Sequence, residues 1–245
     1  MIPKIIHYCW FGGNPLPQSA IKCINSWKKF FPDYEIREWN EENFDVDMMP
    51  FTQEAYKARK YAFVSDVARF WILYREGGLY FDTDVEVIAP MDDIVERGAF
   101  MGVEAMDVYE KGWPAVAPGL GLGVEAGNVF YHDILQYYKT IHYCDSNGER
   151  LPGTVVMHTT KLLKEKGLKP TDGVQCVMGI WIYPQDYFCP LNDVTGILTK
   201  TPNTRSIHWY SKTWNAKPLW YYKITRILHR IFGEKSLRGL KGGKQ

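Results

Sequence analysis

The chain has 245 residues, of which 46% are hydrophobic and 23% charged, and its formal net charge is +1. This length and composition fit a soluble protein with one large domain, or a domain with a short appendage, that buries a hydrophobic core. Five cysteines without a CxxC pair argue against a disulfide framework and a cysteine-rich zinc site, and no apolar run approaches the ~18 residues of a membrane span.

The charge is unevenly distributed along the chain. Residues 212–245 contain nine Lys or Arg and one acidic residue, Glu234, whereas the preceding residues contain 20 basic and 27 acidic side chains. A mildly acidic body with a basic tail does not match a nucleic-acid-binding protein, whose basic surface extends across the fold. The first residues also lack the long apolar core of a signal peptide, so we expect a cytoplasmic protein with no nucleic-acid partner.

The first predicted elements are a strand, a helix and a second strand. Lys4–Trp10 is a short apolar run stopped by two glycines, which predicts a buried strand. Between Pro17 and Phe31 apolar residues recur at helical spacing, and Pro32 ends the segment. The alternating stretch Tyr34–Trp39 predicts the second strand.

The next predicted helix, Tyr61–Glu76, is the strongest pattern in the chain. Val67, Phe70, Trp71 and Tyr74 lie at the spacing of a helix packed on a core. Two glycines, 77 and 78, supply a left-handed stop after it. A strand then begins at residue 79, is interrupted by Asp82-Thr83-Asp84, and resumes over residues 85–88.

The later chain continues the alternation of strands and helices. Strands are expected near residues 99–104, 180–183 and 207–210, helices near 129–142 and 154–166, and a glycine-rich turn region over 119–127. This alternation predicts an α/β architecture with a mainly parallel sheet. Ligands in such sheets bind beyond the carboxyl ends of the strands, where Asp82-Thr83-Asp84 falls.

Asp82 and Asp84 are a candidate cation site. Residues two apart on a strand point to the same side, so both carboxylates can face one ligand. Carboxylates that converge in a partly buried place repel each other unless a cation is present, and Mg²⁺ and Mn²⁺ favour such oxygen ligands. A departing diphosphate accumulates negative charge that the same cation would stabilise.

The chain contains a second copy of this spacing, Asp45-Val46-Asp47. That copy follows the polar stretch Asn40–Asn43 and is expected to be an inert, solvated loop. What distinguishes Asp82-Thr83-Asp84 is its context, with an apolar strand before and after it and a charged helix upstream.

The upstream helix carries Asp66 and Arg69, three residues apart and therefore on one face. As a surface ion pair they would contribute only ~0.3–0.5 kcal/mol. Their apolar neighbours indicate burial instead, and burying a charge pair costs desolvation free energy. Both a structural and a functional role are therefore open from the pattern alone.

Two segments resemble one family of sugar transferases. Ser65-Asp66-Val67-Ala68-Arg69 and the stretch Tyr74–Asp84 resemble the signature of the DxD-containing glycosyltransferase family 32, and residues 2–13 resemble that family's first strand. The family includes capsular-polysaccharide transferases and yeast-type mannosyltransferases and is related to the large glucosylating bacterial toxins. The resemblance covers roughly the first 90 residues closely and the rest more loosely.

The resemblance implies a GT-A fold, a Rossmann-like nucleotide-binding sheet flanked by helices. We place it over residues 1–217, with residues 218–245 as a basic amphipathic C-terminal tail. Trp10 matches the position whose ring stacks near the nucleotide base, although a core role is equally open. Asp66 and Arg69 match positions that hold the donor's sugar hydroxyls or phosphate. Asp82 matches the residue that touches the ribose and donor sugar, and Asp84 the direct metal ligand.

The segment Ser206–Trp214 resembles the family's C-terminal His-Trp…Trp segment. It makes His208 a candidate to complete the site of a Mn²⁺ or Mg²⁺ ion with Asp84 and Asp82, because neutral imidazole is an acceptable ligand among oxygens. Lys212 and Trp214 are donor-binding candidates that would close over the diphosphate as a water-excluding lid. Gly119–Gly123 lacks the spacing of a phosphate-binding loop and is expected to be a flexible loop on the acceptor side.

Members of the family retain anomeric configuration. The resemblance therefore implies a retaining hexosyltransferase that moves sugar from a nucleotide sugar, with UDP expected, to a glycan or lipid-linked glycan in polysaccharide or capsule biosynthesis. The sequence identifies no nucleophile, and a front-face substitution assisted by a diphosphate oxygen requires no protein base. The alternatives are a metal-dependent nucleotidyltransferase or phosphodiesterase, which would want further carboxylates, and a non-catalytic carbohydrate-binding protein.

The stretch Leu219–Phe232 separates apolar from basic residues around a helix. This pattern, with Trp and Tyr beside Arg and Lys, is typical of an interfacial helix on an anionic membrane. Such a helix would hold the protein as a peripheral membrane protein at the inner face of the plasma membrane. An ordinary closing helix packed on the domain fits the pattern equally well.

Overall fold

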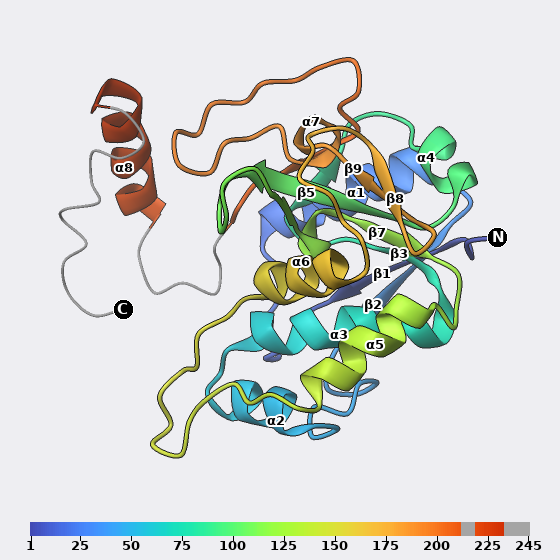
Figure 1. The fold of residues 1–245 in the computed structure, drawn as a ribbon, viewed down its shortest axis with the longest axis vertical. Coiled ribbons are helices and arrows are strands. Elements are labelled where there is room, and N and C mark those ends of the chain that lie inside the picture. The colour runs from blue at the N-terminus through green and yellow to red at the C-terminus, as the bar shows by residue number, and fades with distance from the viewer. Residues whose placement is uncertain (212–218, 233–245) are drawn as a thin grey trace.

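The computed structural model describes residues 1–211 and 219–232, and a central β-sheet runs through it (Figure 1). The sheet has the order β2-β1-β3-β7-β5-β9-β8, with β6 added on β5. β1 pairs in parallel with β2 and β3, and β5 with β9, whereas β7, β6 and β8 pair antiparallel with their neighbours. The strands are β1 (Ile5–Cys9), β2 (Glu35–Trp39), β3 (Gly78–Tyr80), β5 (Phe100–Met106), β6 (Pro114–Val116), β7 (Leu122–Val124), β8 (Gln175–Val177) and β9 (Ile180–Tyr183).

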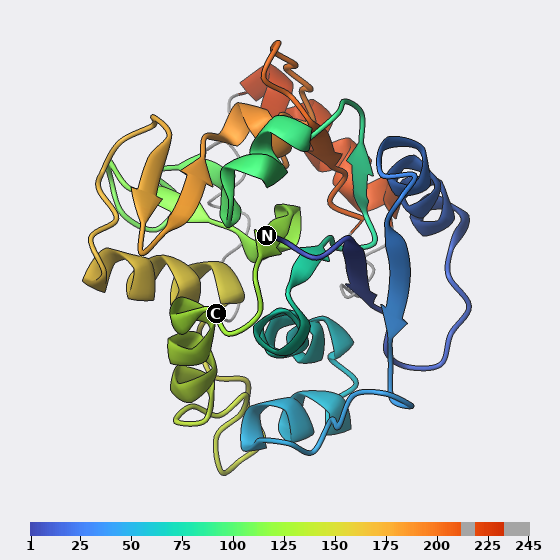
Figure 2. The ribbon, with the colours of Figure 1, turned by 90° about the vertical axis from the view of Figure 1, so that its right-hand side faces the viewer.

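Helices cover both faces of this sheet (Figure 2). One hydrophobic cluster joins the sheet to α1, α4 and α7, and a second joins it to α2, α3, α5 and α6. The expected α/β class, a sheet flanked by helices, is therefore confirmed. The helices are α1 (Gln18–Phe30), α2 (Pro50–Lys57), α3 (Tyr61–Glu76), α4 (Asp92–Arg97), α5 (Val129–Tyr138), α6 (Val155–Glu165), α7 (Gln185–Phe188) and α8 (Leu219–Phe232), with a 3₁₀ turn η1 (Pro118–Leu120).

Helix α3 positions the candidate site because it is buried on most of its surface. Val64, Val67, Phe70 and Leu73 are fully enclosed, as the apolar spacing predicts. The helix ends at Gly77, and Gly78 then passes so close to β1 that a Cβ would lie 2.7 Å from the Ile5 carbonyl oxygen. Both glycines have positive φ, which lets the chain reverse directly into β3.

The chain leaves the main sheet at Asp82-Thr83-Asp84. β4 (Val85–Val87) does not continue β3 but forms a separate antiparallel ladder with β10 (Ser206–His208). The fully buried Trp27 of α1 donates its indole N–H to the Val85 carbonyl oxygen at 2.8 Å. This bond fixes the start of β4, and with it the turn that carries the two aspartates.

Two sequence expectations differ from the structure. The helix expected to reach residue 142 ends at Tyr138, where the Thr140 hydroxyl donates to the Tyr137 carbonyl oxygen. The expectation of a flexible loop at Gly119–Gly123 is wrong, because these residues are buried in η1 and the start of β7. Glycine serves close packing there rather than mobility.

Among the described residues, no helix is both long and apolar enough to cross a membrane. Helix α8 meets the rest of the protein through two arginines. Arg226 bonds to the Asp193 carbonyl oxygen and carboxylate, and Arg230 bonds to the carbonyl oxygens of Thr195 and Gly196. Part of the basic face is therefore occupied with contacts to the protein itself.

His7 of β1 predicts how stability should change with pH. The fully buried ring accepts the Trp39 indole N–H at Nδ1, so Nε2 carries the proton and donates to the Gly77 carbonyl oxygen at 3.0 Å. Burial lowers the pKa of His7 to about 4, from an ordinary value near 6.5. The unfolded chain therefore binds the proton first as pH falls.

We expect the free energy of unfolding to be undiminished by this group above pH 6.5 and to fall by about 3 kcal/mol as pH falls from 6.5 to 4. Denaturant unfolding at several pH values measures this slope. His7→Gln should flatten it in this window, whereas His132→Gln, at a half-exposed position on α5, should leave it in place. An equal slope in His7→Gln would contradict the assignment.

Candidate active site

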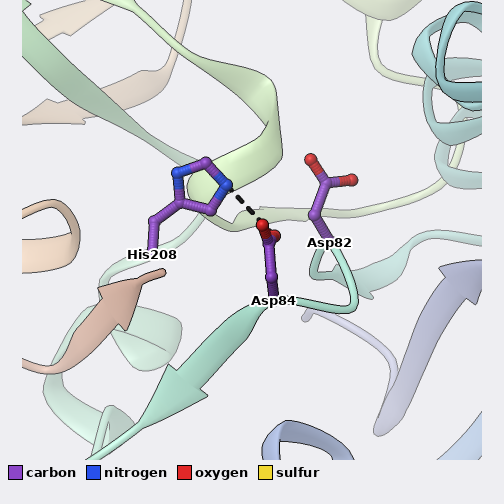
Figure 3. A group of neighbouring side chains, drawn as sticks. All are labelled: Asp82, Asp84 and His208. Carbon is purple, nitrogen blue, oxygen red and sulfur yellow. Dashed lines mark ion pairs between the residues drawn. The ribbon is translucent and has the colours of Figure 1, made fainter. Parts of the chain in front are cut away.

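Asp82, Asp84 and His208 meet at one end of the β4–β10 ladder (Figure 3). Asp84 directly precedes β4, and His208 of β10 lies opposite Val85 in the register. One ligand atom from each of the three residues lies within 4.8 Å of the others. The two carboxylates predicted from their spacing are therefore joined by the histidine predicted from the family resemblance.

Asp84 and His208 form a partly buried ion pair. His208 Nε2 lies 3.1 Å from Asp84 Oδ1, and the Ser211 amide N–H donates to Asp84 Oδ2 at 2.8 Å. Burial raises the pKa of Asp84, but the His208 charge and these hydrogen bonds outweigh it and hold that pKa well below its usual range. Burial lowers the pKa of His208, and the Asp84 carboxylate outweighs it and raises that pKa well above its usual value.

These side chains fit a divalent cation. Two carboxylates and an imidazole are ligands that Mn²⁺ accepts, and Mg²⁺ accepts the carboxylates. His208 Nε2 lies 3.1 Å from Asp84 Oδ1, so this nitrogen is on the side where the carboxylates could share an ion. A cation would take the place of the His208 proton in balancing the charge of Asp84. Asp84, Asp82 and His208 are thus the residues that would hold it.

A second network connects Asp82 to helix α3. Arg69, whose side chain is 3% exposed, lies 2.9 Å from Asp66 Oδ1 and 3.2 Å from Asp82 Oδ1. The Tyr80 hydroxyl donates to Asp82 Oδ1 at 3.0 Å. Burial raises the pKa of Asp66 to about 7, against the lowering effect of Arg69. The pair predicted on one helix face is therefore largely buried and links α3 to Asp82 of the candidate metal site.

Gly119 of η1 leaves room for Asp82. A Cβ at this glycine would lie 2.2 Å from Asp82 Oδ2, and the Asp82 amide N–H donates to the Gly119 carbonyl oxygen at 3.3 Å. The glycine-rich segment therefore packs directly against Asp82 and forms a hydrogen bond with its main chain. We still do not expect this segment to bind phosphate, because Gly119 lies directly against the negatively charged Asp82 carboxylate.

The remaining residues predicted from the sequence lie in different environments, and two of them lie outside the described part of the chain. Trp10 is half-buried at the carboxyl end of β1, next to the strand that leads to Asp82, and its indole N–H donates to the Asn14 carbonyl oxygen at 2.6 Å. Asp45 and Asp47 are exposed and bonded to each other in a local turn, as expected of a solvated loop. Lys212 and Trp214 lie outside the described residues.

Three groups near this site were not predicted from the sequence. Tyr80 is two residues before Asp82 on the same side of a strand, a signal that could have found it. The Ser211 amide binds Asp84 through its main chain and leaves no residue-type signal. Burial raises the pKa of Glu104 on β5 to about 7 against the lowering effect of the His208 charge, and nothing in its local sequence marks it.

Comparisons with known proteins agree with this geometry. A family model described as a glycosyltransferase sugar-binding region containing the DXD motif matches residues 17–101. Inositol phosphoceramide mannosyltransferase 1 of Schizosaccharomyces pombe is 29% identical over 129 residues, which are 48% of this chain and 39% of that protein. Inositol phosphoceramide mannosyltransferase 3 of the same organism is 33% identical over 104 residues, which are 41% and 29% of the two chains.

The chain thus spans less than half the length of these relatives. Among solved structures, the one described as PaToxG glycosyltransferase superposes with a TM-score of 0.47 at 22% identity, covering 68% of this chain and 70% of that one. The family match contains the Asp66–Arg69 pair and both site aspartates. Residues 17–101 are therefore similar to the DXD-containing sugar-binding region of glycosyltransferases, and Asp82-Thr83-Asp84 is the DXD tripeptide within that match.

Proposed function

We propose that the chain is a metal-dependent retaining hexosyltransferase that moves a sugar from a nucleotide sugar to a glycan or lipid-linked glycan acceptor. The observation that carries this proposal is the convergence of Asp82, Asp84 and His208 within 4.8 Å at the strand ends. Asp82, Asp84 and His208 would hold a cation, which would supply positive charge to the diphosphate as the bond between sugar and diphosphate breaks. Polysaccharide biosynthesis, including capsule synthesis, is the process that this activity would serve.

The residues of the second network have separate roles in this proposal. Arg69 keeps the Asp82 carboxylate oriented, and Asp66 offers its carboxylate to the donor sugar hydroxyls. Trp10 would receive the nucleotide base at the carboxyl end of β1, with Lys212 and Trp214 as donor-binding residues from the following segment. Transfer from the front face of the sugar retains the anomeric configuration.

The identity of the donor nucleotide sugar can be determined by screening candidate donors in the presence of Mn²⁺. UDP-linked hexoses are our expectation, and mannose is included because the relatives in Schizosaccharomyces pombe are named as mannosyltransferases. Donor hydrolysis across UDP- and GDP-sugars, with and without Mn²⁺, identifies the preferred donor without knowledge of the acceptor. If no nucleotide binds in a metal-dependent way, the proposal fails and a carbohydrate-binding role remains.

A nucleotidyltransferase or phosphodiesterase is less well supported. Such enzymes commonly hold two ions 3.5–4 Å apart with several shared carboxylates. Among the described residues, the only ligand cluster contains two carboxylates and one imidazole, which suffices for one ion. The small number of carboxylates in the cluster favours sugar transfer over a reaction that needs two metal ions.

We also propose that α8 brings the enzyme to the inner face of the plasma membrane, while the protein remains cytoplasmic. Ile224, Ile227 and Ile231 form one stripe along α8 and are 49%, 53% and 66% exposed. Arg226 and Arg230, by contrast, face the protein. Apolar contact with a lipid surface, reinforced by the remaining basic residues, would suit a lipid-linked acceptor.

Replacing the three isoleucines with serine should weaken vesicle binding at least about tenfold, because their apolar area no longer leaves water. Co-sedimentation with vesicles of mixed phosphatidylglycerol and phosphatidylcholine measures this. A variant with Val129→Ser and Met157→Ser, which are exposed on α5 and α6, is the control and should bind as the wild type does. Equal binding by all three proteins would exclude membrane attachment through α8.

A further inference from the structure

A pocket with aromatic walls lies between the helices on one side of the sheet. It has a volume of about 390 Å³ and is lined by residues of α2, α3, α5 and α6 and of the segment that joins α5 to α6. Small-molecule sites commonly have volumes of ~300–1,000 Å³. We call it the aromatic pocket, because its lining includes the rings of Phe51, Phe63, Tyr137 and Tyr143.

The outer wall of the aromatic pocket, residues 139–154, is fixed on α2. The Glu54 carboxylate of α2 accepts the amide N–H of Tyr143 at 2.9 Å and that of the next residue at 3.3 Å. The Tyr143 ring packs against Phe51 and Phe63, with ring centres 5.9 and 5.1 Å apart. Figure 1 shows this segment passing beside α2 on its way to α6. The pocket is therefore largely formed before a ligand enters it, which lowers the entropy cost of binding.

Arg150 brings a positive charge to this pocket. Its guanidinium carbon lies over the Phe63 ring, 4.7 Å from the ring centre, and one nitrogen donates to the Gly153 carbonyl oxygen at 2.8 Å. Within residues 1–211 and 219–232, no aspartate or glutamate lines the pocket or forms an ion pair with Arg150. The remaining guanidinium N–H groups are therefore available to an anionic group of a ligand, for which a planar guanidinium is well suited.

Polar groups accompany the aromatic rings of the pocket. The Tyr137 hydroxyl of α5 lies 3.0 Å from His158 Nδ1 of α6, and both residues line the pocket. His158 Nε2 has no hydrogen-bond partner in the described part of the chain. Aromatic rings contact the carbon face of a sugar, whereas hydroxyl and imidazole groups form hydrogen bonds with its hydroxyl groups. This combination fits a saccharide better than a purely apolar ligand.

The aromatic pocket adjoins the end of the proposed active site that binds the donor sugar. Phe63 precedes Asp66 by three residues in α3, so the two side chains are neighbours on one helix face, separated by an axial rise of ~4.5 Å. Asp66 contacts Arg69, and Arg69 contacts Asp82 of the candidate metal site. The metal site, the donor sugar and the aromatic pocket thus follow one another in the order that transfer to an acceptor requires.

Resting on the proposed function, we propose that the aromatic pocket binds an acceptor sugar that carries a negatively charged group. Phe63 holds the Arg150 guanidinium in place, and Arg150 binds the charged group, which is a carboxylate or a phosphate. The remaining aromatic rings contact the carbon face of the sugar, and Tyr137 and His158 bind its hydroxyl groups. The acceptor is therefore an acidic saccharide rather than a neutral one.

Methyl glycosides that differ only at carbon 6 test this assignment. The probes are a neutral hexoside, the corresponding uronic acid and the corresponding 6-phosphate, each in gluco, galacto and manno form, titrated into the full chain and followed by NMR. At least one charged probe should bind ~10-fold or more tightly than its neutral counterpart, because a hydrogen bond to a charged group contributes ~1.5–3 kcal/mol. The uronic acid and the 6-phosphate distinguish the two kinds of anionic group.

The variant Arg150→Met should bind the charged probe no more tightly than the neutral one. The matched control is Arg75→Met, because Arg75 also lies over an aromatic ring, at 4.6 Å from the centre of Trp71, but does not line the pocket. This control should keep the wild-type preference for the charged probe. The assignment is overturned if no probe binds, if charged and neutral probes bind equally, or if Arg150→Met retains the preference.

Donor hydrolysis with Mn²⁺ separates this assignment from the proposed function. In Arg150→Met, hydrolysis without an acceptor should stay within about twofold of the wild type, whereas transfer to the preferred charged glycoside should fall ~10-fold or more. Lost hydrolysis or weakened nucleotide affinity in this variant would place Arg150 in the donor site and overturn the assignment. If the wild type neither binds a nucleotide with Mn²⁺ nor hydrolyses a donor, the proposed function fails and the acceptor role fails with it, even where an acidic sugar binds.

Discussion

Replacing Asp84 with asparagine should abolish metal-dependent nucleotide binding and lower sugar transfer by ~10³-fold or more. Asparagine has nearly the same shape but no charge, so the cation loses its main anionic ligand and the diphosphate loses the charge that stabilises its departure. Asp84 also holds His208 in place at 3.1 Å, so the variant disturbs both strands at this end of the β4–β10 ladder. Calorimetric titration of UDP with and without Mn²⁺ measures the binding, and donor hydrolysis measures the chemistry.

The chain supplies its own control for this experiment. Asp47→Asn alters the other aspartate pair of the same spacing, which is exposed in a local turn. It should leave nucleotide affinity and turnover at their wild-type values. Metal-dependent UDP binding that survives in Asp84→Asn would remove Asp84 from the metal site and would leave the motif with a structural role.

Replacing Arg69 with methionine should destabilise the folded protein by ~3–5 kcal/mol, the typical cost of removing one partner of a buried ion pair. The guanidinium is 3% exposed and contacts both Asp66 and Asp82, so its loss leaves two carboxylates without their counter-ion. In a chain of this size the Tm should fall by ~6–20 °C. Donor turnover should fall as well, because Asp82 loses the contact that orients it.

The control for charge lost from the same helix is Arg75→Met. Arg75 is exposed and lies over the Trp71 ring at 4.6 Å, so its loss should cost no more than ~1 kcal/mol. Adding Asp66→Asn to Arg69→Met should restore part of the stability, since one of the two unpaired charges is removed. A double variant as unstable as the single one would show that the arginine acts through packing rather than through its charge.

The parts of the fold predicted from the sequence are those that local residues determine. Helix α3 follows from apolar spacing and two stop glycines, and both act within a few residues of the backbone they shape. The short strands β6, β7 and β8 were not predicted, because three residues carry too little periodicity and the partner strand decides their conformation. The exit of β4 from the main sheet depends on β10, which lies far along the chain.

The residues of the candidate site can likewise be divided into those that the local sequence identifies and those that depend on distant parts of the chain. Asp66, Arg69, Asp82 and Asp84 come from two consecutive elements, so spacing and context identified them together. His208 was reached only through the family resemblance, because a single histidine in an aromatic segment has no spacing to interpret. Glu104 was missed because it lies at a bulge of β5 against β6, and a bulge is a property of two paired strands rather than of either sequence alone.

Because β4 and β10 come from distant parts of the chain, an ion at the candidate metal site would link these two parts to each other. The Ser211 amide and the Asp84 carboxylate are 127 positions apart in the chain, and the site exists only when these two regions meet. An ion bound there closes a very long chain loop and would hold β10 against the body of the protein. The segment that matches the glycosyltransferase family model, residues 17–101, does not contain His208. A fragment cut to that segment would carry the whole motif yet lack the closing end of the loop.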